Sequence, residues 1–301
     1  MTRRDDEARR SVLSPDAGAA PGHRPAPGCL AVLGRREQRQ VQRAQPPPVH
    51  PDHLGGDLPA GPSAVDPCER SFTAYGFKET VTPRAMTLAD IEETVEEYRV
   101  ASENARRAGF DGVEIGALGV FLFAQFLNPR LNRRTDAYGG DRARRRRLLL
   151  DVVDAAAGAW GRRGVGVRLS PWWTGGRFTA DAATLADYDE LVTALNDHPV
   201  AYLHLRGPDL AHPSDVADPA VFARHRRRFG GPLIVNNGFD QASANTAVRE
   251  GVADAVSFAR HFVANPDLVS RFALGRALAA GDPAAYYEGG ARGYADYPAA
   301  G

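Results

Sequence analysis

The stretch AGFDGVEI occupies residues 108–115 and marks a change from a helix to a buried strand. Upstream of it, Thr87 is placed to cap a helix that has one apolar face and ends at Gly109. Downstream, Gly112 to Ile115 form a run with the length of a short strand. A helix that leads directly into a buried strand is the repeating unit of α/β proteins.

The same alternation continues along the chain. We expect further strands at 165–169, 202–205, 232–235 and 253–258, and helices near 141–160, 184–196, 219–229 and 240–250. Strands joined by helical crossovers predict a parallel sheet. Periodicity alone does not separate a doubly wound sheet from a (β/α)8 barrel, but in both folds the polar residues that follow the strands build the site.

Composition excludes several classes of partner. The 301 residues carry 37 Lys and Arg against 37 Asp and Glu, so no overall field favours nucleic acid or an anionic membrane. Cys29 and Cys68 are far apart, which suits neither a disulfide framework nor a metal site. No apolar run approaches the roughly 20 residues of a membrane helix, so we expect a cytoplasmic protein with free thiols.

The N-terminal part differs from the rest. Residues 1–49 contain an Arg/Gln run at 35–40 and three prolines at 46–48, with scarcely any apolar periodicity. The sequence therefore predicts an irregular or poorly ordered segment over 1–49 and an α/β region over 50–301.

Several motifs resemble the old yellow enzyme family of FMN-dependent ene reductases. They occur in family order at 108–115, 125–129, 132–140, 165–171, 237–240, 262–268 and 290–298. A weaker likeness runs from His50 to Ala64 and over 81–84. The resemblance thus spans roughly residues 50 to 300.

This resemblance implies a TIM-type (β/α)8 barrel that holds FMN at its C-terminal mouth and takes hydride from NAD(P)H. The predicted strands would be strands four to eight of that barrel. Only 49 residues precede His50, and their one apolar candidate strand is 29–33. We therefore expect a divergent, N-terminally truncated member whose barrel is incomplete or irregular over its first three strands. A homo-oligomer or a partner chain would have to complete it, because open strand edges and core side chains are otherwise exposed.

The resemblance also implies a cofactor site. Gly238 and Arg260 match the family's phosphate positions, while Asn237 and Ala259 stand where the family commonly has glycine. Arg168, at the end of its strand, matches the residue that faces the flavin pyrimidine edge; the alternative is a salt bridge at the barrel rim.

The family's substrate-activating pattern, His-x-x-Asn/His-x-Tyr, is replaced. Its positions are occupied by Gly116, Gly119 and Phe121, none of which offers a side-chain donor for an enolate oxygen or a proton. No catalytic residue is therefore assigned, although Tyr287 resembles a family tyrosine near the substrate and is a candidate proton donor. Phe121, Tyr287 and Trp172 are the candidate substrate contacts, with packing as the alternative for Tyr287 and Trp172.

Two other features have structural interpretations. The arginines at 142 and 144–147 begin an amphipathic helix, so a solvated face is favoured over phosphate or nucleic-acid binding. His204 lies in a short strand, and no second potential metal ligand stands at a spacing typical of metal sites. The sequence therefore favours a structural histidine and no metal.

The function predicted from the sequence is an FMN-dependent oxidoreductase that carries hydride from NAD(P)H to a small activated alkene. Two alternatives stay open because the activating residues are replaced. One is a non-reducing relative, either an isomerase or a substrate-binding accessory protein. The other is a catalytically defective truncated homologue.

Overall fold

The computed structural model describes residues 31–32, 58–73, 76–161, 164–211, 215–286, 292–293 and 296–299. Apart from 31–32, the segment 1–49 that we expected to be irregular lies outside these residues. So do Cys29, Tyr287 and residues 290, 291, 294 and 295 of the motif at 290–298.

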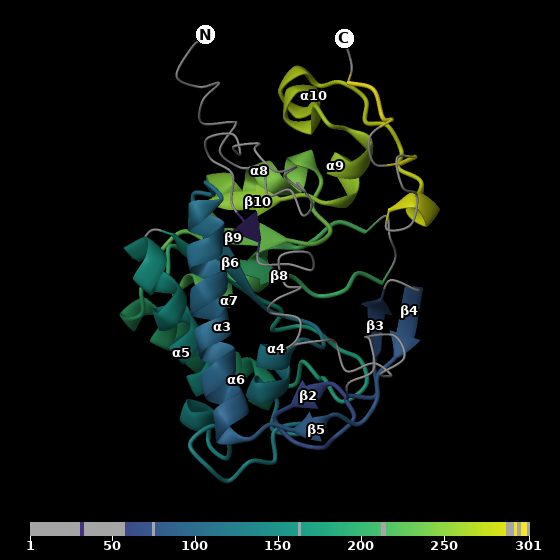
Figure 1. The fold of residues 1–301 in the computed structure, drawn as a ribbon. Helices are drawn as coiled ribbons and strands as arrows, with labels where there is room; N and C mark the ends of the chain where they lie inside the picture. Colours follow the sequence, from purple (N-terminus) through teal and green to yellow (C-terminus); the bar gives the residue numbers. More distant parts are fainter. Residues whose placement is uncertain are drawn as a thin grey trace.

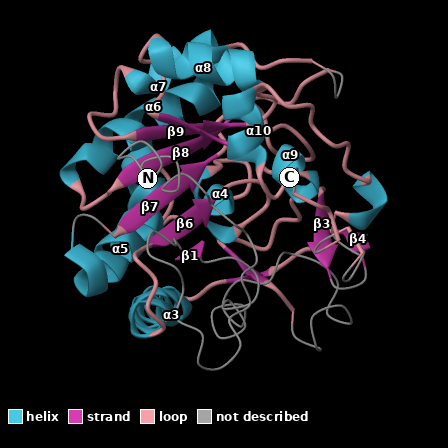
Figure 2. Cartoon of the chain, turned by 90° about the horizontal axis from the view of Figure 1, so that it is seen from above, coloured by secondary structure: helices cyan, strands magenta, loops and turns pink. Residues whose placement is uncertain are grey.

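The centre of the molecule is a parallel sheet of six strands in the order β1-β6-β7-β8-β9-β10. Strands β6, β8, β9 and β10 are labelled in Figure 1, and β1 and β7 in Figure 2. The strands are β1 (Ala31–Val32), β6 (Val113–Ala117), β7 (Val165–Leu169), β8 (Tyr202–Arg206), β9 (Leu233–Asn236) and β10 (Ala255–Ser257). The five strands predicted from the alternating pattern are all present, and the apolar candidate at 29–33 contributes β1 beside β6. The expected parallel sheet is therefore confirmed.

Among the described residues, the sheet is open between β10 and β1. Each pairing that the structure records joins neighbours in the order above, and none joins the first strand to the last. Of the three front strands that a full barrel needs, the described part contains β1. This agrees with the expectation of a barrel that is incomplete over its front.

The helices follow the strands as expected. Thr87 caps α3 (Leu88–Arg107) in a capping box with Asp90, and Asp141, Asp181 and Asp240 cap the next three long helices through their carboxylates. The remaining elements are α4 (Leu122–Leu127), α5 (Arg142–Trp160), α6 (Ala182–Ala194), η4 (Leu195–Asp197), η5 (Pro219–Phe222), α7 (Ala223–Arg226), α8 (Gln241–Arg249), α9 (Arg260–Ala264), α10 (Leu268–Leu274) and η6 (Pro283–Ala285). None of the helices in this part of the chain is both long and apolar enough to cross a membrane.

The core lies between one face of the sheet and the helices that cover it. Figure 2 shows α3, α5, α6, α7 and α8 around the outer side of the strands. The side chains that point to them are fully buried: Val113, Ile115, Val165, Val167, Leu169, Leu203, Leu205, Leu233 and Val235. Burial of each such side chain contributes about 1.5–3 kcal/mol, so this face holds the sheet together.

The alternate residues of the strands face the inner side. They are polar or glycine at most positions, including Glu114, Gly116, Arg168 and His204. Because strand side chains alternate between faces, the same strands that build the apolar core also line a polar lumen.

A small outer layer packs near the β7–α6 loop. Strand β2 (Ala60–Gly61) pairs with β5 (Arg84–Ala85), and β3 (Arg70–Thr73) forms a hairpin with β4 (Gly76–Glu79). A Cβ on Gly176 would lie 2.3 Å from the carbonyl oxygens of Pro67 and Cys68, so only glycine permits this approach. The N–H of Arg177 donates to the Pro67 oxygen at 2.9 Å and joins the two segments.

Candidate active site

The carboxyl ends of β6 to β10 meet at one edge of the sheet because the strands are parallel. The loops that follow β9 and β10 begin side by side, since Asn236 is paired with Ser257 in the register of these strands. The structure therefore brings together the two loops in which the sequence placed the phosphate-binding residues.

The loop after β9 has a left-handed backbone. Asn237 has a φ of 89° and Gly238 a φ of 77°. Asparagine is one of the few residues that tolerate this region, and its side-chain amide donates to the Pro208 oxygen at 2.7 Å. The bulk that Asn237 adds beside the loop is thus tied to the segment that follows β8.

Glycine at 238 is favoured by its positive φ, and a Cβ would in addition displace the side chain of Leu210. A Cβ at this position would lie 2.3 Å from Cδ1 of Leu210. Two successive left-handed residues form a turn whose N–H groups are suited to an anion.

The loop after β10 supplies a cation. Ala259 precedes α9 without a side-chain cap, and Arg260 begins this helix with an exposed side chain. Within the described part of the chain, Arg260 forms no recorded ion pair or hydrogen bond, so its guanidinium is available to a ligand. Gly238 and Arg260 together retain the chemistry that a phosphate group needs.

Arg168 extends from β7 into the lumen. One of its terminal nitrogens, Nη2, donates to Oδ1 of Asn236 at 3.2 Å, and its Nε is buried without a partner in the structure. Burial lowers the pKa of Arg168, while the nearby Glu114 carboxylate raises it. The predicted rim salt bridge is thus only partly realised: Glu114 acts on Arg168 through charge, and Nε remains a donor for an additional group.

A polar network that the sequence did not reveal lies beside Arg168. Oε2 of Glu114 accepts hydrogen bonds from the hydroxyl of Tyr202 at 3.0 Å and from Nδ1 of His204 at 2.9 Å. Nε2 of His204 lies 2.9 Å from Oγ of Ser257. His204 is therefore held within a hydrogen-bond network by both ring nitrogens. Among the described residues, no group of three or more potential metal ligands comes together.

The protonation states in this network follow from burial and charge. Burial opposes ionisation of Glu114, but His204, Arg168 and Tyr202 outweigh it and lower the pKa of the carboxyl. Burial also lowers the pKa of His204, although Glu114 opposes this. The consistent state is an anionic Glu114 that accepts Nδ1–H from a neutral His204.

The residues at the family's activating positions provide no side-chain donor. Gly116 faces the lumen opposite Arg168 in the register of β6 and β7. Gly119 has a φ of 56° and donates its own N–H to Oγ of Ser170 at 3.0 Å. Phe121 precedes α4 and is half-buried, without a side-chain capping bond.

The two tryptophans after β7 take different places. Trp172 is buried, with its ring edge-on to Phe222 and His225 at centroid distances of 5.3 and 5.1 Å. These contacts support the packing alternative for Trp172, and the substrate contact stays a prediction. Trp173 lies nearer the surface, with the guanidinium of Arg206 4.8 Å from its ring centroid.

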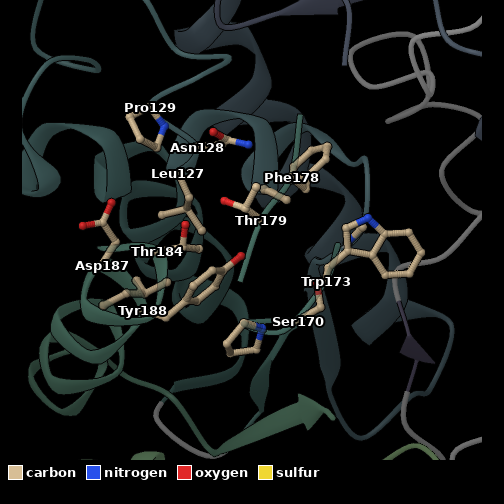
Figure 3. A pocket seen from close by; sticks show the side chains of 14 residues that line it. Leu127, Asn128, Pro129, Ser170, Trp173, Phe178, Thr179, Thr184, Asp187 and Tyr188 are labelled. Carbon is tan, nitrogen blue, oxygen red and sulfur yellow. Dashed lines mark hydrogen bonds between the residues drawn. The ribbon is translucent and has the colours of Figure 1, made fainter. Parts of the chain in front are cut away.

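A cavity lies next to the β6–α4 loop (Figure 3). Gly119, Ser170, Trp173, Phe178 and Tyr188 contribute to its walls, and it encloses about 30 Å³. This volume holds about one water molecule, so the cavity is not the site of a flavin or of an organic substrate.

The arginines that begin α5 are occupied by acidic neighbours. Arg142 contacts Asp187 and Glu190, and Arg145 also contacts Asp187. Arg144, Arg146 and Arg147 pair with Asp141, Glu190 and Asp151. Arg145 is buried, whereas Arg142, Arg144, Arg146 and Arg147 keep part of their side chains exposed, which supports the predicted solvated face for these four.

The fold and the mouth define the class: an α/β-barrel protein whose candidate active site lies at the carboxyl ends of its strands. A family model described as the NADH:flavin oxidoreductase / NADH oxidase family matches residues 30–279. The chain belongs to this family, which confirms the old yellow enzyme resemblance.

Curated proteins are also similar in sequence to this chain. The chain is 38% identical over 267 residues to a putative 12-oxophytodienoate reductase 12 of Oryza sativa subsp. japonica, covering 82% of this chain and 63% of the rice protein. It is 38% identical over 243 residues to a probable flavin mononucleotide-dependent alkene reductase of Leishmania infantum, covering 79% and 65%. The chain therefore spans less than two thirds of the length of these curated relatives.

Solved structures agree in fold. Morphinone reductase in complex with tetrahydroNAD superposes with a TM-score of 0.72 at 39% identity, over 82% of this chain and 68% of that one. The old yellow enzyme homologue from Zymomonas mobilis gives 0.74 at 31% identity, over 83% and 70%. The expected TIM-type barrel architecture is thereby confirmed.

Proposed function

We propose that this chain is a flavin-dependent oxidoreductase that binds FMN at the mouth of the sheet and accepts electrons from NAD(P)H. The observation that carries the proposal is the placement of Arg168, with its buried and unpartnered Nε, beside the loops of Gly238 and Arg260. Relatives named for flavin-dependent alkene reduction and for a complex with a nicotinamide analogue support the same assignment.

Each residue of the mouth has a role in this proposal. The left-handed turn at Asn237 and Gly238 and the exposed guanidinium of Arg260 hold the phosphate. Arg168 places a fixed positive charge against the edge of the ring that becomes negative on reduction. Bound FMN supplies hydride transfer, which no side chain of the protein provides.

The residues of the site support the second half of the reaction, in which the acceptor is reduced, less well than the first. Gly116, Gly119 and Phe121 leave the developing oxyanion and the α-carbon without side-chain donors. Loss of one such donor commonly lowers the rate about 10²–10³-fold. We therefore infer that alkenes are reduced slowly, and that acceptors which need no proton from the protein are favoured.

A second candidate function is supported by the same three residues. A mouth that binds an apolar small molecule but cannot donate to it suits a non-reducing relative, such as a substrate-binding accessory protein. The two candidates differ in whether NAD(P)H is consumed.

The test begins with the absorption spectrum of the purified protein before and after addition of FMN, followed by NADPH without oxygen. Retained flavin that bleaches on addition of NADPH supports the oxidoreductase, and retained flavin that stays oxidised favours the second candidate. Arg260→Ala should weaken FMN binding about tenfold or more, because a charge-assisted phosphate contact is removed. Arg249→Ala removes another exposed arginine, at the C-terminal end of α8 and so at the opposite end of this helix from the loop of Gly238, and should leave FMN binding unchanged.

A further inference from the structure

Three inner-facing side chains form one polar layer across the sheet. Glu114 comes from β6, His204 from β8 and Ser257 from β10. Side chains of alternate strands share a layer in TIM-type barrels, which explains how residues so far apart in sequence meet. The layer is independent of the replaced loop after β6.

The three side chains of this layer contact one another in the order carboxylate, imidazole, hydroxyl. Glu114 Oε2 lies 2.9 Å from Nδ1 of His204, and Nε2 of the same ring lies 2.9 Å from Oγ of Ser257. Because the Glu114 carboxylate only accepts, Nδ1 carries the hydrogen and Nε2 is free to accept from the serine hydroxyl. Glu114 and His204 are buried, whereas Ser257 is half-buried and keeps part of its surface open.

We propose that Ser257 is an activated nucleophile, with His204 as its general base and Glu114 as the orienting acid, and that the chain hydrolyses small carboxylic esters. This arrangement of acid, histidine and serine is recognised by geometry and roles, independently of fold and of residue order. The proposal needs neither flavin nor NAD(P)H and stands apart from the function proposed above.

The acid is held in place by a second contact. The hydroxyl of Tyr202 donates to Glu114 Oε2 at 3.0 Å. Tyr202 reaches it by crossing Gly166, where a Cβ would lie 2.1 Å from the tyrosine ring. Gly166 thus permits the contact that fixes the carboxylate opposite His204.

A cation is connected to Ser257 through one intervening side chain, that of Asn236. Arg168 donates to Oδ1 of Asn236, whose Nδ2 donates to the Ser257 carbonyl at 2.8 Å. The buried Nε of Arg168 has no partner, so it is free to stabilise an oxyanion that forms next to Ser257.

The chemical step balances without another oxidant or reductant. Oγ of Ser257 attacks the ester carbonyl, its proton passes to Nε2 of His204, and the alcohol leaves with that proton. Water then attacks the acyl-serine ester and His204 takes its proton; the bond between the acyl carbon and Oγ breaks, the proton passes from Nε2 to Oγ, and the carboxylic acid is released with Ser257 and His204 regenerated.

The test uses the full chain as purified, with p-nitrophenyl acetate as substrate and a fluorophosphonate as serine-directed probe. Mass spectrometry should place the phosphonyl group on Ser257, with loss of fluoride. Hydrolysis should increase with pH as one group loses its proton and reach its plateau by about pH 7, because the neutral form of His204 is active.

Ser257→Ala should lower the rate above background at least about 100-fold and abolish labelling. Ser257→Cys keeps a nucleophile and should retain a burst of acylation. Ser102→Ala removes a buried serine of α3 whose hydroxyl has no partner, and should change neither result. Equal rates for the protein with Ser257 and the alanine variant, labelling at another residue, or no labelling at all would overturn the proposal.

Discussion

Single residues determine the shape of the loop after β9, where we propose that the phosphate group binds. Gly238 combines a φ of 77° with a neighbour, Leu210, that leaves no room for a Cβ. The sequence identified this position through the family motif. The neighbouring Asn237 was expected to add bulk, and the structure shows that its amide is bonded to Pro208 instead.

Gly238→Ala should weaken FMN binding at least about tenfold, because alanine at a positive φ and against Leu210 must distort the turn. Titration of the apoprotein with FMN measures the effect. Gly140→Ala is the matched control: Gly140 also has a positive φ, of 88°, but a Cβ there meets nothing within 4 Å. Equal losses of FMN affinity in the two variants would contradict the role of the Gly238 turn.

Two of the positions predicted to have lost the family's activating residues have room for a Cβ atom. A Cβ at Gly116 would meet only Leu118 at 3.9 Å, and one at Gly119 would meet nothing within 4 Å. The φ of 56° at Gly119 suits asparagine better than most other residues. These positions are therefore accessible to the donors that the family uses.

The triple variant Gly116→His, Gly119→Asn and Phe121→Tyr should increase the rate of cyclohexenone reduction by about 10² or more, since it supplies oxyanion donors and a phenol. NADPH consumption with cyclohexenone measures it. Phe121→Tyr alone serves as the control, because a proton donor without the oxyanion donors should have a smaller effect. If the triple variant binds FMN but gains no alkene reduction, the missing donors do not limit the reaction.

His225 is a buried histidine without a hydrogen-bond partner for either ring nitrogen. Asp189 is 3.7 Å away, but Arg224 and Arg228 already neutralise this carboxylate. Burial lowers the pKa of His225 from 6.5 to about 4. The unfolded chain therefore binds more protons than the folded one between these two values, and stability decreases as the pH falls through this window.

The loss attributable to His225 should approach roughly 3 kcal/mol near pH 4. His225→Leu removes the titrating group and should flatten the dependence of the unfolding free energy on pH below 6.5. Urea unfolding at pH 8, 6 and 4.5 measures it. A variant whose stability declines as steeply as that of the parent protein would show that other groups cause the acid sensitivity.

At the scale of elements, helices and strands follow from local signals. Thr87, Asp141, Asp181 and Asp240 each accept a hydrogen bond from a backbone N–H in the first turn of the helix that follows. Short apolar runs then supply the strands whose outer faces are fully buried. These signals depend on neighbours in sequence, which is why the five main strands and their helices are predictable.

The capping box of α3 provides a test of whether such a local signal stabilises its helix. Thr87→Ala removes a hydroxyl that accepts from the Asp90 N–H at 3.1 Å and should lower the unfolding free energy by about 1 kcal/mol. Thr193→Ala, inside α6, is the control, because alanine's helix propensity offsets the loss of its bond to the Asp189 carbonyl. Urea denaturation followed by circular dichroism compares the two, and equal effects would remove the special role of the cap.

At the scale of the whole molecule, the contacts between side chains in the polar lumen could not be predicted from local sequence signals. Glu114, Tyr202, His204 and Ser257 meet only after the strands are set side by side. The alternation of polar residues with buried apolar ones in β6 and β8 is the signal that indicates an inner polar face. It does not specify which side chains contact each other, because the contacts depend on the register across the sheet.

The charges of this lumen add to the backbone hydrogen bonds, side-chain hydrogen bonds and apolar contacts that join the strands. Glu114 is buried and ionised next to Arg168, whose charge has no other recorded carboxylate partner in the described part of the chain. Glu114→Gln leaves that guanidinium without its counter-charge and should lower the unfolding free energy by about 3 kcal/mol, whereas Glu114→Gln with Arg168→Met should recover most of the loss. Urea unfolding of the parent, both single variants and the double variant gives the coupling energy directly. Additive losses would show that the two charges are solvated separately and that the lumen does not act as one unit; recovery in the double variant would show that this buried pair connects β6 to β7 across the open sheet.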